Sequence, residues 1–263
     1  MKTSEIRDLA IKRHDIDASF FQETYLDKVK NVKKVHPFRY GRSLILEDLK
    51  KVLDQLAPGS KVLDIGSGTG HMTEWIASMG FEVTGMEPSK EMIGYARGNF
   101  PAITFVEGIS SAIPFEPQSF DLVVAFEVFR YLDETENKET FTDVYRVLKP
   151  GGQFFFTQVN RSATDLYFLF YYIKKLAYKV KDKVYHFCYF TTPGHQEELM
   201  KDAGYKDVKT IGRMSATIRF AYKLGKSFGD GYVKLMEKIF GKQRFTKGPL
   251  KAMAGHLIVI GTK

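Results

Sequence analysis

The sequence of 263 residues contains a single cysteine and no long apolar run. One cysteine excludes an intramolecular disulfide, a zinc site built from several cysteines and a three-cysteine iron–sulfur motif. We expect Cys188 itself to be a small buried apolar residue rather than a nucleophile. The uninterrupted apolar run at residues 166–173 is far shorter than the roughly 20 residues that a membrane-spanning helix needs.

The N-terminus also lacks the apolar core of a signal peptide, because residues 1–8 mix basic, acidic and polar side chains. We therefore expect a cytoplasmic protein, with peripheral contact to a membrane as an alternative. The length and the 44% hydrophobic content favour one large domain with appendages. We place a helical N-terminal cap at residues 1–57 and the main domain at residues 58–263, with inserts at 161–190 and 213–254.

A glycine-rich turn stands out at residues 62–70, which read Val-Leu-Asp-Ile-Gly-Ser-Gly-Thr-Gly. The apolar start is typical of a strand, and residues 71–79 are typical of a helix. Gly66, Gly68 and Gly70 allow backbone torsions and a close ligand approach that a Cβ atom would obstruct. The pattern is typical of a nucleotide-binding turn, but His71 stands where a dinucleotide-binding turn carries its last glycine or alanine.

A second strand-like run at residues 81–86 ends at Glu87, which lies 21 residues after Gly66. A carboxylate at this place can accept hydrogen bonds from both hydroxyl groups of a ribose. Further runs at residues 103–106, 120–132, 147–156 and 190–205 continue the alternation of strands and helices.

With Asp64, the three glycines and Glu87 in this order, the chain resembles the class I S-adenosylmethionine-dependent methyltransferases, in particular the methyltransferase type 11 or quinone-biosynthesis-like group. The resemblance covers about residues 40–212 and 256–263. It implies an α/β, Rossmann-like fold with a seven-stranded, mostly parallel sheet whose last strand, at residues 257–261, is antiparallel. It also implies S-adenosylmethionine as cofactor, S-adenosylhomocysteine as product and no metal. The alternative is a structural glycine turn in another α/β protein.

The resemblance implies a set of cofactor-binding positions. These are Asp64, Gly66, Ser67, Gly68, Gly70, Glu87, Pro88, Ile109, Ser110, Phe126 and Glu127. One of them departs from the family pattern, because many relatives carry at position 109 an acid that accepts from the adenine amino group. Ile109 can only press on the ring, so polar recognition of adenine would fall to Ser110, Ser111 or backbone groups.

Most candidates for substrate binding and catalysis come from two regions, and Tyr25, Tyr171 and His186 lie outside them. Residues 36–41 read as a non-helical joint with polar side chains, and this region folds over the cofactor in relatives. Residues 127–131 follow the fourth strand, at the edge of the sheet where such folds bind ligands. Arg130 replaces a histidine found in relatives and could clamp a carboxylate or phosphate. The substrate-binding candidates are Tyr25, Arg39, Tyr40, Arg130, Tyr131 and Tyr171, and the catalytic candidates are His36, Arg130, Tyr131 and His186. Each has a structural alternative, such as a capping histidine, a surface arginine or a half-buried tyrosine.

The net charge of +8 is concentrated in the inserts. Residues 1–160 hold 19 basic and 23 acidic side chains, whereas residues 161–190 hold six and two, and residues 213–251 hold ten and two. Solvated lysines would explain this, and so would an anionic substrate, a lipid headgroup surface or a nucleic acid. Residues 166–180 also read as an amphipathic helix, which suits an ordinary packed cap, a lid over an apolar pocket or a helix lying on a membrane.

The resemblance implies transfer of a methyl group to an O or N atom of a small molecule or lipid intermediate, by in-line displacement. The partner would be that substrate, with an anionic one as an option. Nucleic acid is disfavoured, because residues 125–128 lack the motif that exocyclic-amine methyltransferases carry after the fourth strand. One alternative is a non-catalytic regulatory or scaffold protein that binds S-adenosylmethionine, and another is a peripheral membrane enzyme that methylates a lipid through contacts of the basic inserts.

Overall fold

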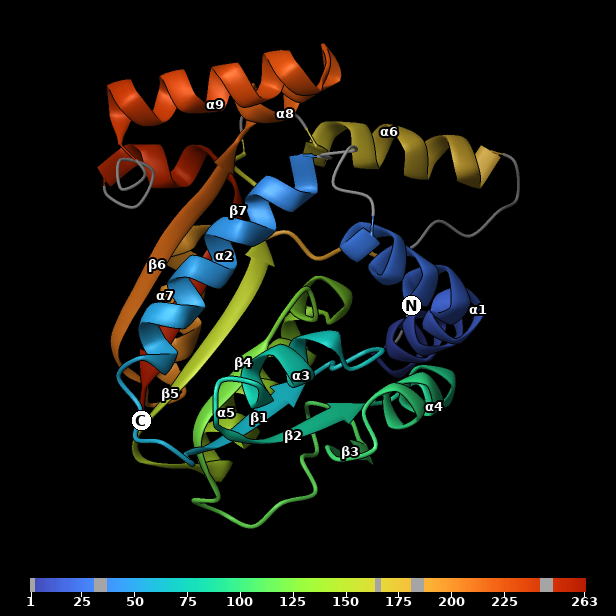
Figure 1. Cartoon of the computed structure of the whole chain (residues 1–263), viewed down its shortest axis with the longest axis vertical. Coiled ribbons are helices and arrows are strands. Elements are labelled where there is room, and N and C mark those ends of the chain that lie inside the picture. Colours follow the sequence, from blue (N-terminus) through green and yellow to red (C-terminus); the bar gives the residue numbers. More distant parts are fainter. Residues whose placement is uncertain (1–2, 31–36, 164–166, 181–186, 242–247) are drawn as a thin grey trace.

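The computed structural model describes residues 3–30, 37–163, 167–180, 187–241 and 248–263. Seven strands form one sheet in the order β3-β2-β1-β4-β5-β7-β6 (Figure 1). They are β1 Lys61–Ile65, β2 Glu82–Glu87, β3 Thr104–Glu107, β4 Phe120–Ala125, β5 Leu148–Val159, β6 Lys206–Ser215 and β7 Ala254–Thr262. Strand β7 runs antiparallel to both β5 and β6, and the other strands are parallel to one another. The predicted fold class is therefore confirmed.

Helices cover both faces of the sheet. They are α2 Pro37–Leu53, α3 His71–Ala77, α4 Lys90–Asn99, α5 Glu134–Val147 and α7 Pro193–Asp202, and α1 Thr3–Lys30 packs on α4. Helices α5 and α7 contribute Phe141, Leu199 and Met200 to the core on one face. Helices α2 and α3 contribute Leu49 and Ile76 to the core on the other face. The apolar runs of the central strands are continuous because both of their faces are buried.

Helix α2 corrects the predicted joint at residues 36–41, because Pro37, Phe38, Arg39, Tyr40 and Gly41 are helical. Proline has no backbone N–H and a fixed φ, so it suits the first position of a helix rather than interrupting one. Further along the same helix, the Asp48 carboxylate accepts a hydrogen bond of 2.5 Å from Nε of Arg213, and both side chains are buried. This ion pair fastens α2 to strand β6.

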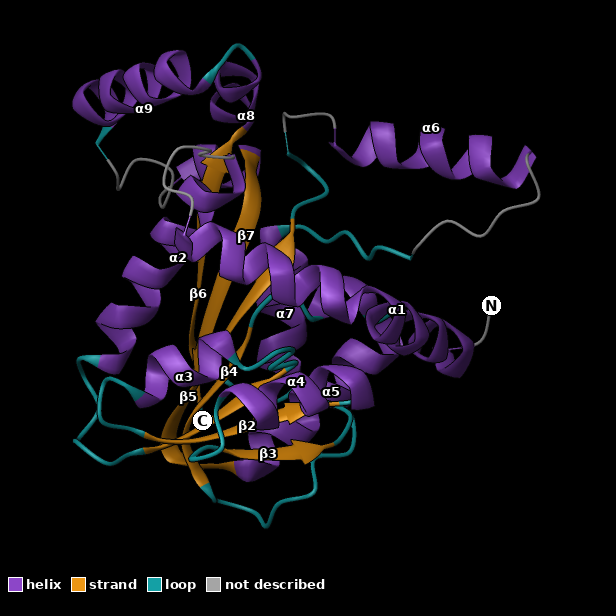
Figure 2. Cartoon of the chain, turned by 45° about the vertical axis from the view of Figure 1, so that its right-hand side comes forward, coloured by secondary structure: helices purple, strands orange, loops and turns teal. Residues whose placement is uncertain are grey.

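The inserts form α6 Tyr167–Val180, α8 Ala216–Lys223, α9 Lys226–Phe240 and the short helix η3 Gly248–Met253. Helices α6, α8 and α9 lie at the same end of the molecule in two views (Figures 1 and 2). The expectation that residues 166–180 make an ordinary packed cap is wrong for the side chains that the structure describes, because the apolar side chains of Phe170 and Ile173 are exposed. Only Tyr171 is buried among the described side chains of α6, since the helix rests on the body near its N-terminal end. No helix within the described residues is long and apolar enough to cross a membrane.

Candidate active site

The glycine turn joins β1 to α3 and is held against β2. The backbone amides of Gly66 and Ser67 donate to the carbonyl oxygen of Met86, at 2.7 and 3.1 Å. Gly66 has a φ of +70°, and a Cβ atom added there would overlap Cγ2 of Val128. The turn therefore needs glycine at position 66 both for its left-handed backbone and for the lack of a side chain.

Glu87 ends β2 beside this turn, and its carboxylate is buried. One oxygen accepts from the amide of Gly68 at 3.0 Å, and the other accepts from the amide of Ser89 at 3.0 Å. Burial raises the pKa of Glu87 to about 7, although these two hydrogen bonds act in the opposite direction. Each carboxylate oxygen has a further lone pair, so the group can still accept hydrogen bonds from a ligand.

Asp64 lies on the neighbouring strand β1 and is 1% exposed. Its carboxylate accepts a hydrogen bond of 2.7 Å from the hydroxyl of Thr73, which ties the strand to α3. Burial raises the pKa of Asp64 to about 7, and the nearby charge of Glu87 acts in the same direction. The two acids thus lie at adjacent strand ends, where parallel α/β sheets bind their ligands.

A cavity of about 230 Å³ opens at this edge of the sheet, and Asp64, Glu87 and the glycine turn line it. The hydroxyl oxygen of Ser67 also belongs to this lining; it is buried and has no hydrogen-bond partner among the described residues. A buried hydroxyl without a partner is costly, so this atom is available to a bound polar group.

Glu127 forms the opposite wall, just after β4, with a φ of +58°. Its amide donates to the hydroxyl of Thr157 at 2.8 Å, and its carboxylate accepts from Nη1 of Arg130 at 3.1 Å. Nδ1 of His256 lies 3.2 Å from the other carboxylate oxygen. Burial acts to raise the pKa of Glu127, but His256 and Arg130 outweigh it and hold that pKa well below its usual range. The carboxylate of Glu127 is therefore held in place and ionised by its contacts with Arg130 and His256.

Helix α1 forms the roof of the cavity. Arg7, Ala10, Ile11 and His14 line it, and their spacing of three, four and seven residues places them on one helical face. The ring of His14 meets that of Tyr131, in the short helix η1 Phe129–Tyr131, edge to face at 4.8 Å between centroids. Burial lowers the pKa of His14, although Asp17 and Asp15 act to raise it, so its imidazole is neutral at pH 7.

Most of the predicted cofactor-binding residues meet at this cavity. The residues that line it are Asp64, Gly66, Ser67, Gly68, Glu87, Pro88, Phe126 and Glu127. Gly70, Ile109 and Ser110 are not in the lining. Gly70 starts α3, and the hydroxyl of Ser110 lies 2.8 Å from that of Thr140, where both are buried. A role for these three residues in cofactor binding stays a prediction.

The predicted substrate and catalytic residues are brought together only in part. Tyr131 lines the cavity. Arg130 instead donates a hydrogen bond from Nη1 to the carboxylate of Glu127, and its Nη2 lies 3.8 Å from Sγ of Cys188. Tyr171 does not line the cavity, because its side chain is buried in a separate cluster and its hydroxyl accepts from the amide of Cys188 at 3.0 Å. Its role in substrate binding stays a prediction. His36, His186 and the side chains of Tyr25, Arg39 and Tyr40 lie outside the residues that the structure describes. Cys188 is buried, as expected.

The sequence interpretation missed several residues of the site. They are Arg7, His14, Arg42, His71, Thr157 and His256. The face of α1 could have been found from the helical spacing of residues 7, 10, 11 and 14 within the predicted N-terminal cap. His256 is 129 residues from Glu127, and no local pattern links the two. Within the described part of the chain, no group of three His, Cys, Asp or Glu side chains could hold a metal ion.

Comparison with known proteins places this site in context. Residues 62–152 match the family described as a methyltransferase domain. The demethylmenaquinone methyltransferase of Chlorobaculum tepidum is 31% identical over 161 residues, which make up 56% of this chain and 65% of that protein. The ubiquinone biosynthesis O-methyltransferase of Vibrio atlanticus is 24% identical over 87% of this chain and 91% of that protein. The chain spans between about half and two thirds of the length of the first curated relatives it matches.

A solved structure extends the likeness to the fold. It is phosphoethanolamine N-methyltransferase 2 of Haemonchus contortus, in complex with phosphomonomethylethanolamine and S-adenosylhomocysteine. The TM-score is 0.58 at 22% identity, and the match covers 84% of this chain and 52% of that chain. At this identity the likeness concerns the arrangement of the sheet and helices around the cavity.

Proposed function

We propose that this chain, which carries a class I S-adenosylmethionine-dependent methyltransferase domain, transfers the methyl group of S-adenosylmethionine to an O or N atom of a small molecule or lipid intermediate. The observation that carries the proposal is the buried carboxylate of Glu87 at the end of β2, facing the same cavity as the glycine turn. Glycines alone would also suit a purely structural turn, but a buried carboxylate facing the same cavity is typical of nucleoside recognition.

The residues around the cavity fit this cofactor. Glu87 would accept from the ribose hydroxyls, and the turn at Gly66 and Gly68 would let the ligand approach the backbone. The hydroxyl of Ser67 supplies a further buried polar group without a partner among the described residues. When bound there, S-adenosylmethionine supplies a methyl group that its sulfonium has already made electrophilic.

The chain's own task is then to position an acceptor, to exclude water and to remove a proton where the acceptor carries one. His14 is the candidate for the proton transfer, because its imidazole is neutral at pH 7 and lines the cavity roof. Tyr131 contacts the edge of that ring and so fixes its orientation. Helix α1 lines the cavity and would limit the access of water to the reacting groups.

Binding should be tested first, by isothermal titration with S-adenosylmethionine and S-adenosylhomocysteine. Glu87→Gln should weaken both ligands by about 1 to 3 kcal/mol, because one of the two acceptor oxygens becomes an NH2 group, which cannot accept from a ribose hydroxyl. Glu82→Gln is the matched control, since Glu82 starts the same strand, is 65% exposed and lies away from the cavity. Absence of binding by the wild type would overturn the cofactor assignment.

Turnover separates an enzyme from the alternative, a regulatory protein that only binds the cofactor. We would measure formation of S-adenosylhomocysteine with panels of phenols, quinols and amines as acceptors. An active acceptor should lose turnover in His14→Asn while the Kd for S-adenosylhomocysteine changes little. Tight binding of both ligands without turnover on any acceptor would favour the non-catalytic protein.

A further inference from the structure

The end of the molecule that carries α6, α8 and α9 exposes an unusual amount of apolar side chain. Of the sixteen exposed large apolar residues among the described part of the chain, eleven lie on these three helices or directly after α8. Single exposed apolar residues need no explanation, but a concentration of this kind marks a surface that binds something. We refer to α6, α8 and α9 together as the helical end.

Helix α9 has two apolar faces. Gly229 and Val233 are buried on the side that packs against the rest of the protein. Phe228, Leu235 and Ile239 are each more than half exposed, and their spacing of seven and eleven residues aligns them in one stripe along the helix. A surface helix of a soluble domain normally presents polar residues on its outer face. The outer stripe of α9 is therefore not explained by packing within the chain.

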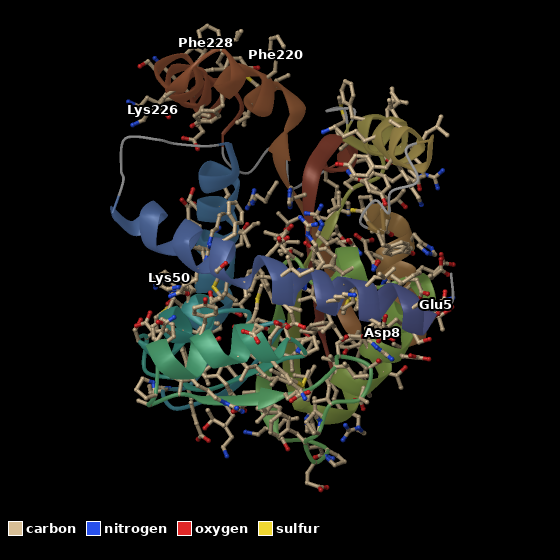
Figure 3. All side chains as sticks on the ribbon, turned by 90° about the vertical axis from the view of Figure 1, so that its right-hand side faces the viewer. Glu5, Asp8, Lys50, Phe220, Lys226 and Phe228 are labelled. Atoms are coloured by element: carbon tan, nitrogen blue, oxygen red, sulfur yellow. The ribbon has the colours of Figure 1, made fainter. Side chains whose placement is uncertain are left out.

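Helix α8 continues the same surface. Ile218 and Ala221 are buried, whereas Phe220 and Leu224 are 64% and 59% exposed and lie four residues apart. Figure 3 shows Phe220 and Phe228 projecting from the outer side of these helices, away from the sheet. The two helices thus present their aromatic side chains in a common direction.

Helix α6 adds a second exposed arm at this end. Its exposed apolar side chains are Leu169, Phe170, Tyr172, Ile173, Leu176 and Tyr178. The buried side chain of Tyr171 anchors it to the cluster around Cys188. Apolar groups thus point outward from more than one side of this helix, which leaves it incompletely buried by the protein itself.

The charge of the helical end indicates what covers it. Within residues 167–180 and 216–241 the sequence has eight basic side chains and two acidic ones. Lys234 and Lys238 follow one edge of the α9 stripe, and Lys174 and Lys175 are exposed on α6. A second copy of this chain would bring two positive surfaces together, which opposes self-association. Apolar and aromatic groups beside lysines complement an anionic bilayer, in which acyl chains lie beneath negative headgroups.

We propose that the helical end docks on the surface of an anionic lipid bilayer, with Phe220, Phe228 and the α9 stripe in the interface and the lysines at the headgroups. Helix α6 follows the end of β5, and α8 follows the end of β6. These two strands are parallel to each other, so both helices lie at the edge of the sheet where the cavity opens. Docking therefore brings the cavity edge close to the bilayer. This proposal concerns the surface alone and does not depend on methyl transfer.

Vesicle flotation tests the proposal, with phosphatidylcholine vesicles compared with vesicles that contain about 30 mol % phosphatidylglycerol. The wild type should float with the anionic vesicles at about 0.05 M salt, and much less at about 0.5 M salt or with neutral vesicles. Phe220→Ser/Phe228→Ser and, separately, Lys234→Glu/Lys238→Glu should each lower the partition coefficient at least tenfold. Retained affinity for S-adenosylhomocysteine and an unchanged circular dichroism spectrum show that these variants fold.

Matched controls use the same chemistry away from the helical end. Leu9→Ser/Ile16→Ser changes two exposed apolar residues of α1, and Lys201→Glu/Lys206→Glu changes two exposed lysines near the opposite end of β6. Both controls should float like the wild type. Absence of wild-type flotation would overturn the proposal, and so would equal loss in the controls. A dimer by light scattering without vesicle binding would assign the surface to a second copy.

A fluorescence measurement reports the contact directly. The only tryptophan of the chain is Trp75 on α3, so Phe228→Trp adds a probe to the α9 stripe. Its emission should move to shorter wavelength on addition of anionic vesicles, because the ring enters a less polar interface. Ile16→Trp on α1 should show no such change. Equal changes in the two variants, or none in Phe228→Trp, would contradict the proposed orientation.

Discussion

The imidazole ring of His14 contacts the ring of Tyr131 edge to face, with centroids 4.8 Å apart and an interplanar angle of 88°. This pair joins helix α1 to the short helix η1 across the cavity. On the same side, the hydroxyl of Ser89 donates to the carboxylate of Asp15 at 2.6 Å. The roof is thus held to the carboxyl ends of two strands, β2 and β4, and the site is closed by contacts between segments distant in sequence.

A double-mutant cycle on His14→Ala and Tyr131→Ala should reveal this pair. We expect a coupling free energy of about 0.5 to 1.5 kcal/mol, because an edge-to-face aromatic pair contributes this much beyond its buried area. The measurement is the free energy of unfolding in urea for the wild type, both single variants and the double variant. His14→Ala combined with Tyr95→Ala, which changes a 37% exposed side chain on α4, is the control and should be additive. Additivity in both cycles would show that the contact contributes nothing.

Gly66→Ala should destabilise the protein by about 1 to 3 kcal/mol and abolish binding of S-adenosylhomocysteine. The left-handed backbone disfavours any side chain, and the new Cβ atom would overlap Val128. Adding Val128→Ala should recover part of the stability, since it removes the overlap but not the backbone strain. Gly94→Ala is the control: this helical glycine has open space around it and should gain about 0.5 to 1 kcal/mol. Thermal and urea unfolding measure both, and a neutral Gly66→Ala would contradict the account of the turn.

The predictable part of this site is the part encoded by local patterns. The glycine turn and Glu87 follow directly after apolar runs, so periodicity and turn chemistry locate them. The wall formed by Glu127, Arg130 and His256 depends on a long-range register, because His256 reaches it only through β7. Tyr171 lies in a cluster with Val159 and Cys188, which the sequence does not reveal, because an aromatic ring in an amphipathic helix suits a pocket and a core equally.

Glu127→Gln should lower the free energy of unfolding at pH 7 by about 1 to 3 kcal/mol, because Arg130 and His256 would then face a neutral group in a largely buried place. Its lowered pKa means that the stabilisation is present above the ordinary pKa of a glutamate and is lost as the pH falls through the folded value. Glu82→Gln removes a 65% exposed carboxylate that pairs with Lys61 and should change stability by less than about 0.5 kcal/mol. Equal effects of the two changes in urea unfolding would show that the wall is not a coupled unit.

The contribution of Asp64 to stability should have the opposite dependence on pH. The folded protein holds a proton on Asp64 up to a pKa of about 7, whereas the unfolded chain releases it near 3.8. The stability due to this group is therefore complete below the unfolded pKa and is lost as the pH rises through about 7. Asparagine keeps an oxygen to accept from Thr73 but cannot ionise, so the variant should avoid this loss.

Between pH 5 and pH 8, we expect Asp64→Asn to gain roughly 2 kcal/mol in the free energy of unfolding relative to the wild type. Urea unfolding across this range, without ligand, measures the change. Asp8→Asn is the control, because Asp8 is a 72% exposed acid on α1, and its difference from the wild type should stay constant over the same range. A constant difference for Asp64→Asn as well would mean that Asp64 is already ionised at pH 5. The buried end of β1 would then carry a charge stabilised by more than its hydrogen bond to Thr73.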